Sequence, residues 1–219
     1  MRNVLSILAI GDLNLISGFS ILLPLTLGLI KLKSLGKEYI LLFVLVCISF
    51  VVEIVAGILS ANTQNNLWLG NIFFLVEGLL WCLVLRQWLE SRKLRLFIFI
   101  FMVIYVIVWT LTTFFVLDFY KFNSYARSLE SFVFVFLSCF LMMAVSTDTS
   151  QVIFKNPKFW FGSALLIYFS VNLIVFGTVN YMATQRTLMD NTWMIHSVTN
   201  IFANLLFAVA FLCIRPRAI

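Results

Sequence analysis

The sequence has little of what a water-soluble domain needs. Charged residues make up 11% of its 219 residues, histidine occurs once and proline three times, while 63% of the residues are hydrophobic. Soluble chains average about 25% charged and about 45–50% apolar residues. A soluble domain would leave much of this apolar excess in water, so that class is excluded. The 24 Phe, 6 Trp and 6 Tyr also exclude a disordered chain, because such chains lack apolar surface.

Paired cysteine motifs are missing as well. The four cysteines lie inside apolar runs and form no CxxC or Cys/His spacing, so neither a disulfide framework nor a zinc knuckle is indicated. They are Cys47, Cys82, Cys139 and Cys213. The net charge of +6 comes from Lys and Arg that flank apolar runs. Membrane topology explains that placement better than nucleic acid does, and we expect no nucleic-acid partner.

Long apolar runs are what the sequence has in abundance. A bilayer core needs roughly 20 apolar residues in a helix, and no run shows the alternation of a membrane barrel strand. The sequence therefore predicts an all-α integral membrane protein, multi-pass in the cell membrane, with one seven-helix domain over residues 1–219. The expected spans are 13–30, 39–60, 67–88, 96–117, 128–146, 159–179 and 192–214.

The first span is interrupted at its start by Asp12 and Asn14. The preceding segment has only Arg2 as a basic residue, a short apolar stretch and no A-x-A cleavage site. A retained helix with a polar outer end is therefore expected rather than a cleaved signal peptide.

Lys and Arg predict the direction of the spans. One set of loops and flanks holds eleven, and the other holds four, namely Arg2, Lys121, Arg127 and Arg186. The eleven are Lys31, Lys33, Lys37, Arg86, Arg92, Lys93, Arg95, Lys155, Lys158, Arg215 and Arg217. Because cytoplasmic loops carry the excess of Lys and Arg, the N-terminus is expected outside and the C-terminus in the cytoplasm.

Polar residues within the spans are the candidates for function, because ionisable groups at membrane depth are rare and costly. With the expected topology, they gather in the outer half of the bundle. His196, Asn200 and Asn204 recur every four residues and so share one helix face. The other candidates are Glu53, Asn71, Glu77, Glu130 and Asn172.

Each candidate also has a structural interpretation. Asn200 and Asn204 could serve as interhelical hydrogen-bonding residues. Glu130 is expected to pair with Arg127 in the solvated headgroup region. Glu53 and Glu77 lie deep inside the apolar runs FVVEIVAG and FLVEGLLW, so a structural role explains them less well.

Three chemistries fit this set of residues. The first is a divalent metal held by Glu53, Glu77, Glu130 and His196, although no two of them have ligand spacing on one helix. The second is a proton or cation relay. The third is a small ligand held over aromatic rings, for which Trp81, Tyr105, Trp109 and Tyr168 are candidates. Retinal is disfavoured, because the last span contains no lysine for its attachment.

We expect a receptor-like or sensor-like protein with a polar small-ligand or cation pocket in its outer half. The expected ligand-binding residues are Glu53, Asn71, Glu77, Asn172, His196 and Asn200. No soluble output module is visible, so the signal would pass to a membrane or cytoplasmic partner at the basic inner loops. A homo-oligomer is a further option. The alternatives are a metal-dependent membrane hydrolase or lipid-modifying enzyme, an ion-coupled transporter and a purely structural subunit.

Overall fold

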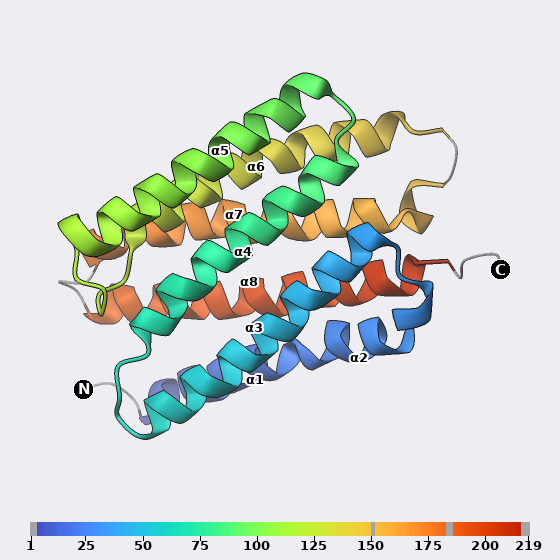
Figure 1. Cartoon of the computed structure of the whole chain (residues 1–219). Helices are drawn as coiled ribbons and strands as arrows, with labels where there is room; N and C mark the ends of the chain where they lie inside the picture. The colour runs from blue at the N-terminus through green and yellow to red at the C-terminus, as the bar shows by residue number, and fades with distance from the viewer. Residues whose placement is uncertain (1–3, 150–151, 183–185, 216–219) are drawn as a thin grey trace.

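The chain is a bundle of long helices (Figure 1). The computed structural model describes the backbone of residues 4–149, 152–182 and 186–215, and the side chains of 12–149, 152–178 and 191–215. The longer helices are α1 (Val4–Ser20), α2 (Leu22–Ile30), α3 (Lys37–Ala61), α4 (Leu67–Trp88), α5 (Arg92–Leu111), α6 (Ser124–Thr147), α7 (Pro157–Met182) and α8 (Arg186–Cys213). Among the described residues, seven segments are long and apolar enough to span a membrane, α1 and α2 together supplying one of them.

The first span is not the single helix that the sequence predicted. It begins at Val4 and is broken at Ile21, between α1 and α2. Pro24 explains the break, because proline has no N–H for the carbonyl of Ser20 and its ring crowds that carbonyl. At the break, the hydroxyl of Ser20 donates to the carbonyl oxygen of Ser17 (2.6 Å).

Helix α6, which corresponds to the expected span 128–146, also differs from the prediction. It begins at Ser124, four residues before the expected start, because the Asn123 side chain caps it by accepting from the backbone N–H of Ala126 (3.1 Å). Arg127, expected in a loop, therefore lies in the first turn of α6. The preceding helix, α5, ends in a short π-helical segment, η2 (Thr112–Val116). Two 3₁₀ turns, η1 (Leu32–Ser34) and η3 (Ile153–Lys155), lie in the connections before α3 and α7.

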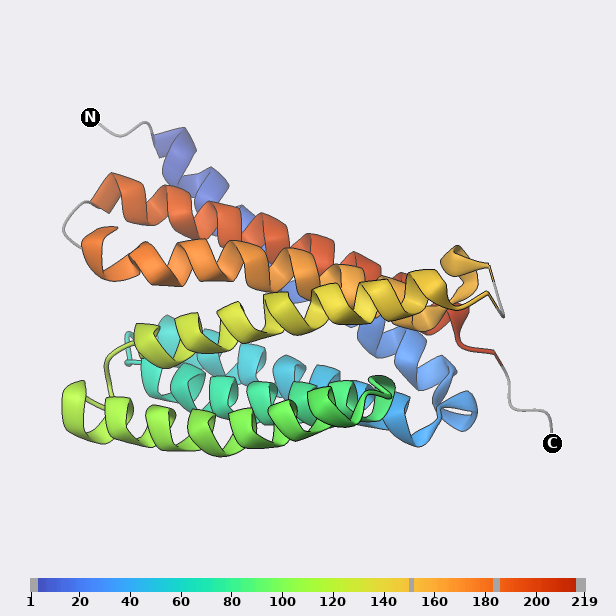
Figure 2. The same ribbon diagram turned by 90° about the horizontal axis from the view of Figure 1, so that it is seen from above.

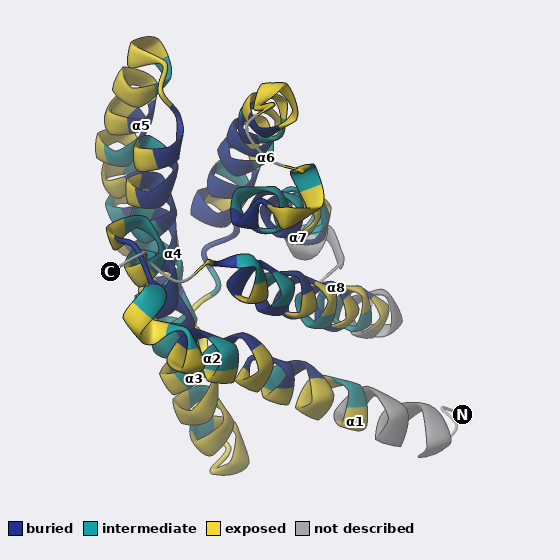
Figure 3. Cartoon of the chain, turned by 90° about the vertical axis from the view of Figure 1, so that its right-hand side faces the viewer, coloured by how far each residue is buried: buried dark blue, intermediate teal, exposed yellow. Residues whose placement is uncertain are grey.

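The helices form two layers. Viewed along the bundle, α3, α4 and α5 make one layer, and α6, α7, α8 and the α1–α2 span make the other (Figure 3). Aromatic rings close the space between the layers in one half. Phe161 of α7 contacts Trp88 of α4 and Phe211 of α8, with ring centroids 5.8 and 5.3 Å apart. At Gly28 of α2 a side chain would collide with the Phe43 ring, so glycine allows α2 and α3 to approach closely.

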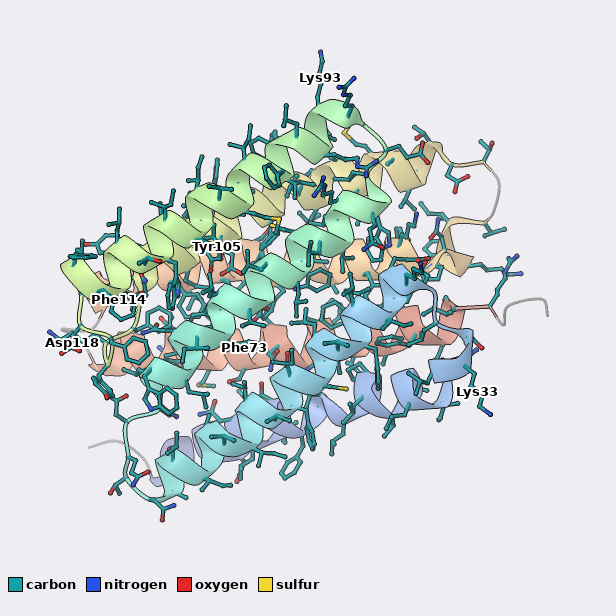
Figure 4. All side chains as sticks on the ribbon, in the orientation of Figure 1. Lys33, Phe73, Lys93, Tyr105, Phe114 and Asp118 are labelled. Atoms are coloured by element: carbon teal, nitrogen blue, oxygen red, sulfur yellow. The ribbon has the colours of Figure 1, made fainter. Side chains whose placement is uncertain are left out.

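The two ends of the bundle differ in charge. The basic end carries the connections before α3, α5 and α7 and the end of α8, and ten of the eleven basic residues predicted for one side lie there. The eleventh, Arg217, is outside the described residues. We call the opposite end the His196 end. Lys33 and Lys93 extend from the basic end, and Asp118 lies at the other (Figure 4).

Candidate functional site

A cavity of about 510 Å³ lies between the two layers. Its walls come from α1, α3, α4, α7 and α8, and α1 separates from α3 toward the His196 end (Figure 2). The separation is plain when the bundle is seen from above, where α1 swings away from the layer of α3, α4 and α5 (Figure 2). The volume is within the range of about 300–1,000 Å³ usual for small-molecule sites.

The cavity wall is polar near the His196 end and aromatic near its floor. Glu53, Glu77, His196 and Asn200, four of the six predicted ligand-binding residues, line it together. The floor toward the basic end is made by Leu42, Trp81, Phe161 and Phe207. Neither Lys nor Arg is among the described residues that line the cavity. The wall thus combines carboxylate and amide groups with a large apolar surface.

Glu53 is exposed and stands on the α3 wall, facing α1. A Cβ atom on Gly18 of α1 would lie 3.0 Å from its Oε1, so the missing side chain makes room for the carboxylate. Glu53 has no ion pair with any described residue. The cavity therefore contains a carboxylate that the described part of the protein does not neutralise.

Glu77, in contrast, is almost fully buried and ion-paired. Its Oε2 accepts from Nη1 of Arg127 (2.7 Å), and the same nitrogen donates to Oε2 of Glu130 (2.8 Å). Arg127 and Glu130 are both 0% exposed, so this pair is buried and not the solvated headgroup pair that the sequence predicted. Arg127 is buried because α6 begins at the Asn123 cap, so Arg127 lies within the helix, and its guanidinium reaches Glu77 of α4.

Two tyrosines and a glycine complete this ionic cluster. Tyr105 of α5 donates to Oε2 of Glu130 (3.1 Å), and the hydroxyl of Tyr168 accepts from Nη2 of Arg127 (3.0 Å). Tyr105, labelled in Figure 4, lies on the side of α5 that faces α4 and α6. Gly78 leaves room for it, because a Cβ there would lie 2.8 Å from the Tyr105 ring. The cluster joins α4, α5, α6 and α7 behind the cavity wall.

Sequence reasoning missed Arg127 as part of the site. A signal was available, since Asn123 and Ser124 are favourable helix-start residues and Arg127 and Glu130 have the i, i+3 spacing of a helical ion pair. Of the four aromatic residues considered for a pocket floor, Trp81 and Tyr168 line the cavity. Tyr105 and Trp109 do not, and each makes a hydrogen bond outside it.

The polar face of α8 holds α1 in place. Asn200 donates to the hydroxyl of Ser17 (3.0 Å), and Asn204 donates to the hydroxyl of Ser20 (2.7 Å). These contacts match the interhelical role considered from the sequence, although both amides also border the cavity. His196, one turn earlier, lies among aromatic rings, with its centroid 5.5 Å from Phe176 and 5.6 Å from Trp193.

Two predicted ligand-binding residues lie outside the cavity. Asn71 is fully buried and holds the connection before α6, donating to the carbonyls of Phe119 (3.0 Å) and Lys121 (2.7 Å) and accepting from the N–H of Asn123 (3.1 Å). Asn172 is fully buried one turn after Tyr168 on α7, and neither polar atom of its carboxamide has a hydrogen-bond partner among the described residues. Asn71 thus has a clear structural role, and Asn172 lies beside the ionic cluster.

A metal site receives no support from this arrangement. Within the described side chains, no three His, Cys, Asp or Glu residues are grouped so that they could hold a metal ion. Of the possible ligands, Glu77 and Glu130 share Arg127, while Glu53 lies on another helix against Gly18. Glu53 is therefore apart from Glu77 and Glu130, and the three carboxylates do not form one ligand set.

Comparison with protein-family models, with curated proteins and with solved structures finds no match to this chain. What the protein does must therefore be argued from its own cavity and charges.

Proposed function

We propose that the protein is a receptor-like membrane protein whose cavity binds a small ligand with a polar group and an apolar body. The observation that carries the proposal is the cavity of about 510 Å³ that is lined by Glu53 and Glu77 from one layer and by His196 and Asn200 from the other. Pockets of this size with few polar groups on a largely apolar wall are typical of small-molecule sites. The protein would lie in the cell membrane with its N-terminus outside, the direction that the basic end supports.

The position of the cavity supports a signalling role. A ligand there would contact α3 and α4 on one side and α8 and α1 on the other. Because the layers meet again at the aromatic floor, a change in their separation at the His196 end would tilt the helices about that floor. The basic end would carry this tilt to a membrane or cytoplasmic partner.

The test is ligand binding by the whole chain in lipid nanodiscs. The probes are decylamine, decanol and decanoate, and native mass spectrometry counts the molecules bound per protein. We expect one-to-one, saturable binding of at least one probe. Gly57→Trp should abolish it, because Gly57 lines the cavity and open space lies where its side chain would project. Val51→Trp is the matched control, since Val51 is exposed on the same helix and does not line the cavity.

Saturable binding of none of the three probes, or equal binding by the Gly57→Trp protein, would overturn the binding role. The receptor role has its own measurement. Spin labels at Gln64 and Asn191, both exposed at the His196 end, report the separation of α3 and α8. A bound probe should change that distance. An unchanged distance at saturation would overturn the receptor role and leave only the binding role.

A further inference from the structure

We infer that the natural ligand is a single-chain cationic amphiphile, with an amine or ammonium head, which enters the cavity sideways from the lipid between α1 and α3. This inference rests on the proposed function and names the ligand class of the same cavity. Three independent observations lead to it: the charge of the wall, the order of polar and apolar surfaces along the cavity, and the small residues on its α1–α3 side.

The charge of the wall selects a cation. Among the described lining residues there are two carboxylates and neither Lys nor Arg. Arg127 neutralises Glu77 from behind the wall, at 2.7 Å, while Glu53 has no ion pair with a described residue. An unpaired carboxylate within a membrane is costly, and a cationic head beside Glu53 would remove that cost. An anionic head would meet the same charge as its own and lose its hydration without compensation.

Aromatic rings in the cavity wall suit the same head group. Phe73 and Phe74 of α4 and Trp193 of α8 line the cavity, and ammonium groups are attracted to the faces of such rings. Arg127 already uses one ring in this way, with its guanidinium 4.3 Å from the centroid of Phe74. The His196 end of the cavity is therefore chemically suited to a cation.

The length of the cavity calls for an apolar body. Leu42 at the floor and Glu53 at the polar part lie on the same helix, eleven residues apart, which corresponds to about 16 Å at 1.5 Å per residue. Trp81, Phe161 and Phe207 surround the floor. A small ion alone would leave this apolar part unfilled, whereas a hydrocarbon chain attached to the head would fill it.

α1 and α3 border one side of the cavity. α2 packs against α3, and α1 diverges from α3 toward the His196 end (Figure 2). Small residues line this side of the cavity, with Gly18 on α1 and Ala56, Gly57 and Ser60 on α3, and the Glu53 carboxylate lies against Gly18. Open space lies next to Gly57, where no atom is within 4 Å of a Cβ position. A ligand already dissolved in the bilayer could therefore reach Glu53 without first crossing an aqueous mouth.

The test compares the three chain-matched probes on the whole chain in nanodiscs and corrects for their partition into empty nanodiscs. We expect the protein to bind decylamine at least about tenfold more tightly than decanol, and decanoate least. Glu53→Gln should remove the preference for decylamine over decanol while decanol binding stays the same. Glu38→Gln is the control, because Glu38 is a carboxylate in the first turn of the same helix outside the cavity.

Entry is tested with a diazirine-bearing decylamine that is photolysed within seconds of mixing. The first labelled peptides should come from the facing sides of α1 and α3, and later ones from α4 and α8. Equal binding of all three probes, or a preference that survives Glu53→Gln, would overturn the cationic class while leaving the binding role in place. Binding of none of the probes would overturn both. First labels confined to the loops of the His196 end would overturn lateral entry.

Discussion

Removing Arg127 should destabilise the bundle strongly, because the structure gives this guanidinium two buried partners of opposite charge. In an Arg127→Met protein, Glu77 and Glu130 lose their shared cation, with side chains 7% and 0% exposed. Breaking a buried ion pair from one side typically costs about 3–5 kcal/mol, because the partner stays buried and uncompensated. We expect a loss of that size in the free energy of unfolding.

Because the cluster has one arginine and two carboxylates, removing the arginine should cost more stability than removing one carboxylate. Glu77→Gln leaves one arginine and one carboxylate, so it should cost only about 1 kcal/mol, comparable with one hydrogen bond. The triple variant Arg127→Met, Glu77→Gln and Glu130→Gln carries no buried charge and should recover most of the stability lost by Arg127→Met. The hydrogen bonding of the cluster is incomplete, since Nε of Arg127 and Oε1 of Glu130 have no hydrogen-bond partner among the described residues. Replacing an incompletely hydrogen-bonded charged cluster by neutral groups therefore favours this recovery.

The assay is reversible unfolding of the purified protein in mixed micelles, followed by circular dichroism as the denaturing detergent is increased. Lys121→Met is the matched control, because Lys121 is exposed in the loop just before α6 and should change the stability by less than about 0.5 kcal/mol. An Arg127→Met protein within about 1 kcal/mol of the wild type would refute the ionic cluster as described. So would a triple variant no more stable than Arg127→Met.

Three further predictions concern the frame around the cavity. Asn71→Ala should cost about 1–3 kcal/mol in the same unfolding assay, because it leaves three backbone groups before α6 without their partner, among them the buried N–H of Asn123, whereas the exposed Asn65→Ala should have a smaller effect. Gly28→Val should sharply lower the yield of folded protein, because the valine side chain would collide with Phe43. The yield is measured from the size-exclusion profile, and a normal profile would contradict the close approach of α2 and α3. For topology, a fluorescent protein fused after residue 219 should fluoresce and one inserted at Gln64 should not; the reverse would contradict an N-terminus outside.

The seven long apolar segments were accessible from the sequence, since apolar length is a strong signal. The sequence predicted the exact bounds of α4, but not the starts of α1 and α6. The break at Ile21 depends on which carbonyl Pro24 crowds, and the start of α6 depends on the Asn123 cap. Such local backbone chemistry is weaker than apolar periodicity, yet the cap alone moves Arg127 from an expected loop to a buried position.

The candidate site was accessible only in part, for a related reason. A carboxylate inside an apolar run can be recognised from its neighbours in the sequence, as Glu53 and Glu77 can. Its partner cannot be recognised in this way, because the sequence does not tell which helix supplies the neutralising charge. Asn71 illustrates the same difficulty, since the sequence around an asparagine in an apolar helix does not show whether the amide faces a cavity or hydrogen-bonds a loop, as Asn71 does.

The pairing of Glu77 with Arg127 has a consequence for how the protein is made. The two residues are separated by 50 positions, so the carboxylate leaves the ribosome well before its cation. At about 5–20 residues per second, the delay is about 2.5–10 s. During that interval the nascent α4 carries an acidic group whose cation has not yet been made, and the synthesis of α6 supplies it. Pulse-labelled chains truncated after residue 120 should therefore be degraded faster than chains truncated after residue 150.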